Sequence, residues 1–417
     1  MNKKISLGLA ISLIIIAATV SFAMTMTVSR QMYNKLIIDL PNRLARYEVV
    51  NEIADLLNTN YYSIKILEES GQSNLNNSIA NGCMKGLNDK SCSFMTADDY
   101  KIYAKILEGK FPDSGIKQIQ NSKTGYMNVT SVTANSLAAN KGIQKGDEII
   151  KINNKIVTAK TYVDLAKELD GYNKKTIDIT FRRNGKDKNI SVQIGSSAQS
   201  VFYKTIEDIG YVKITAFYKN TIDQFNKAIS ALKKQGVENI IFDVRSNSEG
   251  DIKYAAEVID AIVPIASEGT GAIVTIVDRD GKTIDSISSD SNTLNMEMAV
   301  LVNSNTSGCA EVFAQDLKDF KSSNVTLIGE KTAGNWSKQE VFRLKDGNYI
   351  KMTIAKMLPY ITDPYTPNKD GKIVPEIVVS LSDENGNNFD LPDITKDPQI
   401  KAAFDYLKGA QVTNEKS

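Results

Sequence analysis

The first feature in the pattern of apolar and polar residues is a long apolar run near the N-terminus. After Lys3 and Lys4 no charged residue occurs until Arg30, and residues 5–23 are almost wholly apolar. A run of this length predicts one membrane-spanning helix, because it exceeds the core of a typical signal peptide. The segment Ser21-Phe22-Ala23, with small residues at its first and third positions, also offers a cleavage site, so a removed signal peptide is the alternative. In either case the two lysines predict a cytoplasmic N-terminus and a body outside the cytoplasm.

We assign residues 1–30 to this first segment. After it, the apolar residues recur with the spacing of an α-helix. Residues 31–110 are predicted to be a helical region, because the apolar positions of 44–57 and 95–107 recur every three or four residues. The second helix is expected to begin at Thr96, which acidic residues follow in the first turn.

Short strands and turns replace the helical pattern at 111–197. Residues 126–132 alternate, and the strand 148–152 follows the turn Gly146-Asp147. A helix at 162–169 and a hairpin turn at Asn184-Gly185 complete a small β domain.

Strands alternate with helices at 198–395. Buried strands are predicted at 239–244, 298–302 and 325–329, and helices at 255–263 and 311–320. This alternation indicates an α/β sheet with its functional residues at the strand ends. Residues 396–417 are predicted to be a C-terminal helix and a polar tail.

Composition excludes several classes of site. The chain has 50 basic and 49 acidic residues, which does not suggest nucleic-acid binding. It has no histidine, which excludes Ser-His-Asp and Cys-His sites and histidine-based zinc hydrolysis. The three cysteines show no metal-ligand spacing, and no metal or cofactor is expected. Cys83 and Cys92 are interpreted as unpaired thiols, with a short disulfide loop as the alternative.

Two segments resemble the catalytic motifs of the carboxyl-terminal processing peptidases, also called tail-specific proteases. Residues 302–311 read Val-Asn-Ser-Asn-Thr-Ser-Gly-Cys-Ala-Glu, and residues 329–339 read Gly-Glu-Lys-Thr-Ala-Gly-Asn-Trp-Ser-Lys-Gln. That family usually reads V-N-x-x-[ST]-A-S-A-[SA]-E and G-E-x-T-x-G-K-G-x-x-Q. The resemblance implies an α+β multidomain fold, in which a helical N-terminal region and a PDZ-like β domain precede an α/β serine-peptidase core.

The same resemblance implies that the catalytic positions have lost their chemistry. The family's nucleophilic serine corresponds to Gly308, and its basic lysine corresponds to Asn335. Glycine cannot form an acyl intermediate, and an amide cannot act as the base. Gln339 matches the family's glutamine, which orients that lysine.

The oxyanion segment also departs from the family pattern. Residues 243–250 read Asp-Val-Arg-Ser-Asn-Ser-Glu-Gly, so Glu249 stands where the family has its first glycine, before Gly250. A carboxylate there would repel a developing oxyanion. A solvated loop glutamate is the alternative.

Neighbouring residues offer substitutes for the missing groups. Ser307, Thr306 and Cys309 are fallback nucleophiles, but each is rotated about the start of the next helix. Lys338 and Lys331 are fallback bases, and surface charge is the simpler interpretation of both.

Residues 142–154 resemble the PDZ signature G-[IL]-x-x-G-D-x-I-x-x-[IV]-[ND]-G. PDZ domains capture protein C-termini by adding them as a strand. The resemblance places the carboxylate-binding loop at Ser114, Gly115 and Ile116. It places the facing helix at 162–169, where Tyr162, Leu165 and Leu169 complete the groove. The alternative is a domain that only packs against the core.

We therefore expect a membrane-anchored, catalytically degenerate relative that binds C-terminal tails, with a homodimer or an active paralogue as further partners. An active tail-specific endopeptidase that uses Ser307 is the first alternative. A scaffold for an unrelated ligand such as cell-wall material is the second.

Overall fold

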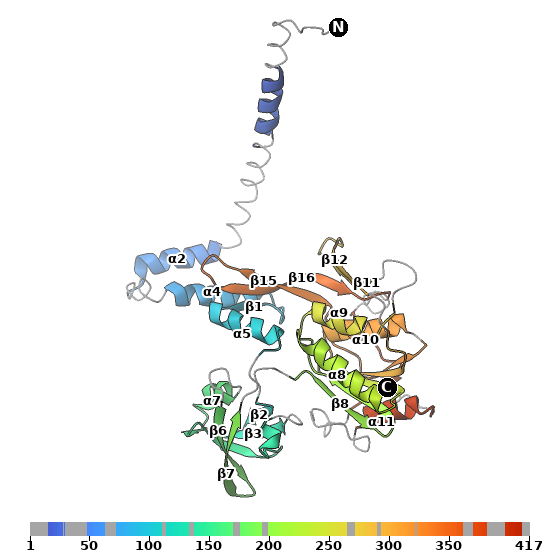
Figure 1. Ribbon diagram of the computed structural model, residues 1–417. Coiled ribbons are helices and arrows are strands. Elements are labelled where there is room, and N and C mark those ends of the chain that lie inside the picture. Colours follow the sequence, from blue (N-terminus) through green and yellow to red (C-terminus); the bar gives the residue numbers. More distant parts are fainter. Residues whose placement is uncertain are drawn as a thin grey trace, which may run out of the picture. The chain divides into compact units, whose positions relative to one another are not determined.

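The chain divides into two compact units, Met1–Gly82 and Cys83–Ser417. The computed structural model describes residues 16–27, 29, 48–62, 72–110, 114–132, 137–169, 176–193, 199–264, 272–289, 293–321, 323–361, 370–381 and 397–410. Figure 1 shows the helices and strands of both units.

The first unit contains a helix over residues 16–27 and α2 (Glu48–Asn60), and α4 (Gln72–Gly86) runs across its end. Within the described ranges, no helix is both long and apolar enough to cross a membrane. Residues 5–15 of the expected span lie outside those ranges. The expected helical character of 31–110 is seen in α2, α4 and α5 (Ala97–Leu107). Thr96 and Asp99 form the capping box that begins α5, as the sequence pattern predicts.

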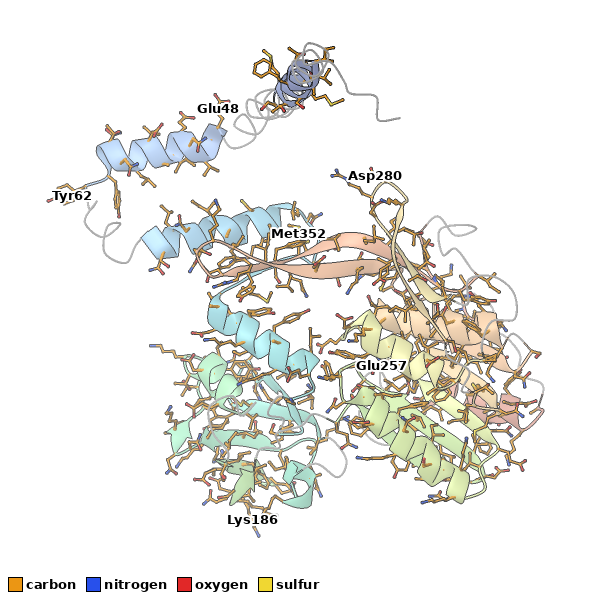
Figure 2. The ribbon with its side chains drawn as sticks, turned by 45° about the horizontal axis from the view of Figure 1, so that its top comes forward. Glu48, Tyr62, Lys186, Glu257, Asp280 and Met352 are labelled. Atoms are coloured by element: carbon orange, nitrogen blue, oxygen red, sulfur yellow. The ribbon has the colours of Figure 1, made fainter. Side chains whose placement is uncertain are left out.

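Residues 114–193 form a small antiparallel β domain. Its sheet has the order β2-β3-β4-β6-β7, and β5 pairs with β4. The strands are β2 (Ile116–Gln120), β3 (Met127–Val132), β4 (Glu148–Ile152), β5 (Lys155–Ile156), β6 (Thr176–Arg183) and β7 (Lys186–Gln193), and the helices are α6 (Leu137–Asn140) and α7 (Tyr162–Leu169). The predicted turn at Gly146 has a φ of 90°, which suits glycine. Lys186 lies at the turn of the β6–β7 hairpin (Figure 2).

A six-stranded sheet organises the rest of the second unit. Its order is β17-β14-β13-β10-β9-β8, parallel throughout except for the antiparallel pair β8–β9. The strands are β8 (Val201–Ile206), β9 (Ile209–Ile214), β10 (Asn239–Asp243), β13 (Glu297–Val302), β14 (Val325–Gly329) and β17 (Ile377–Val378). The three strands predicted from apolar runs are thus confirmed as β10, β13 and β14.

Helices cover both faces of this sheet. The apolar residues of α8 (Thr221–Lys234), α9 (Ile252–Asp260) and α10 (Cys309–Phe320) share one core with one set of strand residues, and α11 (Pro398–Leu407) packs on the other set. The sequence prediction for α9 was wrong at its start, which lies three residues earlier. Asp251 caps this helix, because its carboxylate accepts the Lys253 N–H.

A second, antiparallel sheet contributes to the site described below. It has the order β1-β16-β11-β12, and β15 also pairs with β16. The strands are β1 (Ser93–Met95), β11 (Ala272–Val277), β12 (Thr283–Ser288), β15 (Ser337–Arg343) and β16 (Tyr349–Leu358). Figure 2 marks Met352 on β16 and Asp280 at the β11–β12 turn. The expected mixed α and β architecture is therefore confirmed.

Candidate active site

Gly308 lies at the junction between the loop after β13 and helix α10, for which it is the N-cap residue. Its backbone has φ 64° and ψ −119°, a conformation that strains residues with a side chain. A Cβ placed there would have Asn335 O, at 3.8 Å, as its nearest heavy atom outside its chain neighbours. The position is therefore open and faces the backbone of Asn335.

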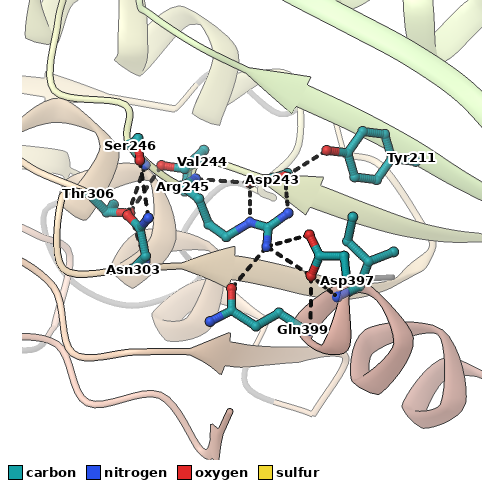
Figure 3. A network of polar contacts seen from close by, with 10 residues as sticks. Tyr211, Asp243, Val244, Arg245, Ser246, Asn303, Thr306, Asp397 and Gln399 are labelled. Atoms are coloured by element: carbon teal, nitrogen blue, oxygen red, sulfur yellow. Dashed lines mark hydrogen bonds and ion pairs between the residues drawn. The ribbon is translucent and has the colours of Figure 1, made fainter. Parts of the chain in front are cut away.

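Hydrogen bonds fix the loop that leads to Gly308. Asn303 accepts the Ser246 N–H through Oδ1 at 2.9 Å, and the Thr306 hydroxyl donates to Val244 O at 3.1 Å. Figure 3 shows these contacts joining the ends of β13 and β10. Thr306 is fully buried, so its hydroxyl is engaged in the scaffold and is not presented to a ligand.

A buried ion-pair network supports the base of the same loop. Arg245 donates to both carboxylate oxygens of Asp243, at 2.9 and 2.7 Å, and also contacts Asp397 and Gln399 at the start of α11 (Figure 3). Tyr211 donates its hydroxyl to Asp243 at 2.6 Å. The network therefore joins the end of β10 to the start of α11 directly before the loop 246–250.

Glu311 joins the two positions at which the resemblance expects catalytic groups. Its carboxylate accepts the N–H groups of Gly308, Gly334 and Asn335 at 3.0, 2.7 and 2.9 Å, and the Thr332 hydroxyl at 2.5 Å. Burial raises the pKa of Glu311, and these hydrogen bonds oppose that rise. Glu311 therefore holds the backbone at Gly308 and at Asn335 in one hydrogen-bonded frame.

Asn335 precedes strand β15 and lies beside buried Trp336, whose indole N–H donates to Gly371 O. The Asn335 amide oxygen accepts the Ser337 N–H at 3.3 Å, and Gln339 Nε2 donates to Ser337 O at 3.1 Å. Neither side chain can take a proton from a hydroxyl. This part of the site can form hydrogen bonds but cannot supply a general base.

A pocket of about 220 Å³ opens between these segments. It brings together many of the residues proposed from the sequence: Gly250, Ser307, Gly308, Cys309, Asn335, Lys338 and Gln339. Glu249 and Lys331 do not line it. Residues that the sequence analysis did not single out also line it, and these include Lys90, Tyr103, Asp251 and Lys351. Lys90, Tyr103 and Lys351 lie far from the motifs in the sequence, so no local pattern marks them, whereas Asp251 directly follows the segment 243–250.

Glu249 is turned toward Tyr218. The Tyr218 hydroxyl donates to its carboxylate at 2.7 Å, and the Glu249 side chain is exposed. Gly250 has a φ of 127°, and a Cβ there would lie 2.3 Å from Phe217 O, so only glycine fits. The backbone of Gly250 therefore packs closely against Phe217, and the neighbouring Glu249 does not prevent this contact.

The fallback groups differ in their surroundings. Ser307 lines the pocket, and its N–H donates to Asn247 O at 3.0 Å. Burial raises the pKa of Cys309 to about 12, which disfavours the nucleophilic thiolate. Lys338 Nζ lies 3.6 Å from Asp251 Oδ2, and Lys331 is exposed. Among the residues that the structure describes, no group of three or more acidic or cysteine side chains could hold a metal ion.

The residues expected to bind a peptide tail lie in the small β domain. Ser114 and Ile116 are buried, Gly115 has a φ of 74°, and the Ile116 N–H donates to Ser114 Oγ at 3.3 Å. Leu165 and Leu169 of α7 are buried in the core of the domain, and Tyr162 packs against that core. In the described sheet β2 pairs only with β3, so its outer edge is the element open to strand addition.

Two family models match these regions. Residues 112–194 match the PDZ domain, and residues 208–379 match Peptidase family S41. The chain therefore combines a region that matches the PDZ domain with a region that matches peptidase family S41. This confirms the resemblance to the carboxyl-terminal processing peptidases on which the sequence analysis rests.

Curated relatives are similar to the chain over most of its length, and a solved structure shares its fold. The chain is 28% identical to the "Probable CtpA-like serine protease" of Staphylococcus haemolyticus, over 84% of this chain and 68% of that protein. It is 25% identical to the protein of the same name from Staphylococcus aureus strain MRSA252, over 75% and 61%. The chain thus spans about two thirds of these relatives. A structure from Bacteroides fragilis NCTC 9343 assigned to the S41 proteases has a TM-score of 0.52 and 17% identity, over 78% of this chain and 87% of that one, which indicates a shared fold.

Proposed function

We propose that this S41 member is catalytically degenerate and binds polypeptides without cleaving them. The observation that carries the proposal is the pairing of Gly308 with Asn335 within an intact Glu311 framework. One position lacks a hydroxyl and the other lacks an amine, so neither an acyl intermediate nor a lysine base can form there. The expected loss of turnover is on the order of 10⁶-fold, as in subtilisin without its nucleophile.

The PDZ domain supports binding of protein C-termini. Strand β2 offers its edge for pairing, and the loop Ser114–Ile116 precedes it, where backbone groups can receive a terminal carboxylate. Because Ile116, Leu165 and Leu169 are buried in the core, main-chain pairing is expected to contribute more affinity than an apolar side-chain pocket.

The proposal extends to location and partners. The apolar run at 5–23 after Lys3 and Lys4 supports a single-pass anchor that places the body outside the cytoplasm. In that setting the chain would act as a scaffold or regulator. It would hold tails for an active relative or act as a homodimer.

An active enzyme with a displaced nucleophile is the second candidate. It is favoured by one observation, that Ser307 and Lys338 line the same pocket. Ser307 precedes the junction residue Gly308, and Lys338 already neighbours Asp251 at 3.6 Å. Lys338 would have to act as the base for this serine.

Incubation of the full chain in detergent with fluorescently quenched casein distinguishes the two candidates. We expect no cleavage above buffer from the unmodified chain. Cleavage would overturn the proposal, and its loss in Ser307→Ala would identify the displaced nucleophile. Ser337→Ala is the matched control, because Ser337 also lines the pocket.

Tail capture is tested with one peptide in two forms, with a free and with an amidated C-terminus. Fluorescence anisotropy should show binding of the free form only, because the amide removes the carboxylate. Gly115→Ala should weaken this binding, since alanine disfavours the φ of 74° in the loop. Gly185→Ala strains a similar φ of 73° in the β6–β7 turn and should leave binding unchanged. Equal affinity of both peptide forms would contradict tail capture.

A further inference from the structure

The pocket at the degenerate site is rich in lysine. Lys90 precedes β1, Lys338 belongs to β15, and Lys351 belongs to β16, yet all three line the same pocket. Strand β16 joins the three segments, because its Lys351 pairs with Ser93 of β1 and its Ala355 pairs with Lys338 of β15. Among the residues that the structure describes, Asp251 is the one carboxylate in the lining, so three lysines against one aspartate leave two formal positive charges in excess.

These lysines are only partly neutralised. Lys338 Nζ lies 3.6 Å from Asp251 Oδ2, which is longer than a charge-assisted hydrogen bond. Lys351 Nζ lies 5.5 Å from the centre of the Tyr103 ring, a contact that leaves its N–H donors available. Within the described residues, neither Lys351 nor Lys90 forms an ion pair with a carboxylate. The pocket is thus lined by lysine ammonium groups that can donate further hydrogen bonds to a ligand.

The rest of the lining suits the same kind of ligand. Side chains of Ser91, Ser248 and Asn335 add polar groups around the lysines. The first residues of α9 and α10, Ile252 and Cys309, also line the pocket, and helix N-termini favour negative charge. Gly308 leaves open the space in front of Asn335.

We propose that this pocket binds a carboxylate of the captured polypeptide, with Lys351 and Lys338 as the principal donors. This inference rests on the proposed function, because it assigns a recognition role to a site that does not cleave. The carboxylate is supplied either by a glutamate or aspartate side chain or by the chain terminus, and both have the same chemistry. The degenerate site would then add selectivity to the strand pairing at the PDZ domain.

The test uses the full chain and three nonapeptides that differ only in charge. One has a central glutamate and an amidated C-terminus, one has a central glutamine and a free C-terminus, and the third has glutamine and an amide. We expect at least one of the two carboxylate peptides to bind about tenfold more tightly than the neutral peptide at low salt, as one charge-assisted hydrogen bond allows. The preference should shrink at high salt.

Variants of the lining assign the preference to the pocket. Lys351→Gln and Lys338→Gln should each reduce it severalfold, and the double variant should abolish it. Lys345→Gln, in the exposed β15–β16 turn, is the matched control and should leave it intact. Asp251→Asn keeps an N-cap side chain for α9 but removes the competing charge, so it should strengthen carboxylate binding severalfold.

The outcomes separate this inference from the function on which it rests. Equal binding of all three peptides, or a preference that survives in the double lysine variant, would overturn the carboxylate site. Tighter binding of the peptide with the free C-terminus could also be lost in Gly115→Ala but kept in Lys351→Gln. That result would assign the carboxylate to the PDZ loop alone and would overturn the pocket site. Mass spectrometry of the same samples reports cleavage, which would overturn the degenerate function independently of any binding result.

Discussion

Glu311 accepts the backbone N–H of Gly308 at 3.0 Å through Oε2, and the same oxygen accepts the N–H of Asn335 at 2.9 Å. One buried carboxylate therefore fixes the two positions at which S41 relatives are expected to carry a nucleophile and a base. Both of these hydrogen bonds come from backbone N–H groups, so they do not depend on which side chains stand at positions 308 and 335. The backbone geometry of the site can therefore be kept whatever side chains these two positions carry.

Replacing Glu311 with glutamine should destabilise the fold. Oε1 accepts Thr332 and Gly334, and Oε2 accepts Gly308 and Asn335, so an amide nitrogen would face donors in either orientation. We expect a loss of about 2–5 kcal/mol in the free energy of unfolding, measured in urea. Glu340→Gln, on the exposed part of β15, should change it by less than about 0.5 kcal/mol. If Glu311→Gln changed the free energy of unfolding by as little as Glu340→Gln, the N–H groups of Gly308, Gly334 and Asn335 would have found other hydrogen-bond acceptors.

Restoring the missing groups should restore some hydrolysis. Gly308→Ser with Asn335→Lys supplies a hydroxyl and an amine on a frame that Glu311 already holds, and a Cβ at 308 meets nothing closer than 3.8 Å. The serine must adopt a φ of 64°, so a stability loss of about 1–3 kcal/mol is expected alongside the activity. Release of fluorescence from quenched casein measures the gain.

The control for this gain is Gly308→Ala with Asn335→Lys, which carries the same strain but no hydroxyl, and it should stay inactive. Adding Glu249→Gly to the restored pair should change the rate little, because the Glu249 carboxylate is bound to Tyr218 and does not line the pocket. A folded but silent double variant would contradict the view that only the side chains at 308 and 335 are missing.

Local sequence patterns predicted the elements whose signals are local. The Thr96 capping box, the Gly146 turn and the buried strands β10, β13 and β14 were anticipated because caps, turns and apolar runs depend on neighbouring residues. The motif resemblance likewise led to Gly308 and Asn335.

The rest of the site depends on distant pairing. Lys351 reaches the pocket through the ladder between β1 and β16, whose partners are more than 250 positions apart, and no local pattern encodes that register. The orientation of Glu249 depends on Tyr218, which the motif does not include. The sequence therefore led to the positions of Gly308 and Asn335 in the pocket lining but not to the charged side chains that line it with them.

Removal of Arg245 should cost far more than removal of a surface cation. Burial alone would raise the pKa of Asp243, but Arg245 and Lys213 hold that pKa below its usual range, so the carboxylate is charged at neutral pH. Arg245→Met leaves this charge without its partner, and we expect a loss of about 3–5 kcal/mol in the free energy of unfolding.

Two further variants test this explanation. Asp243→Asn with Arg245→Met should lose less than Arg245→Met alone, because the fully buried Asp243 charge is removed together with its partner. Lys401→Met removes one member of an exposed ion pair on α11 and should cost less than about 1 kcal/mol. Equal losses in the single and double variants would show that the stabilisation comes from packing and not from the charge pair.

Asp316 should make the protein less stable as pH rises. Its carboxylate is fully buried in α10, Oδ1 accepts the Tyr360 N–H at 2.8 Å, and Oδ2 has no partner in the described structure. Burial, with a smaller contribution from Asp319, raises its pKa well above 3.8. The folded state therefore holds this proton more tightly than the unfolded chain. The resulting stabilisation is complete below about pH 3.8 and is lost as pH rises through the folded-state pKa.

Asp316→Asn imitates the neutral acid and removes this dependence. The difference in unfolding free energy between the variant and the unmodified chain should grow in favour of the variant by about 1.4 kcal/mol per pH unit above pH 4, until the raised pKa is passed. Urea denaturation at intervals from pH 4 to pH 8 measures it, and groups common to both proteins cancel. Asp280→Asn, at the exposed β11–β12 turn, should show a flat difference over the same range. If the difference in unfolding free energy for Asp316→Asn did not change with pH, this carboxylate would ionise in the folded protein as easily as in the unfolded chain.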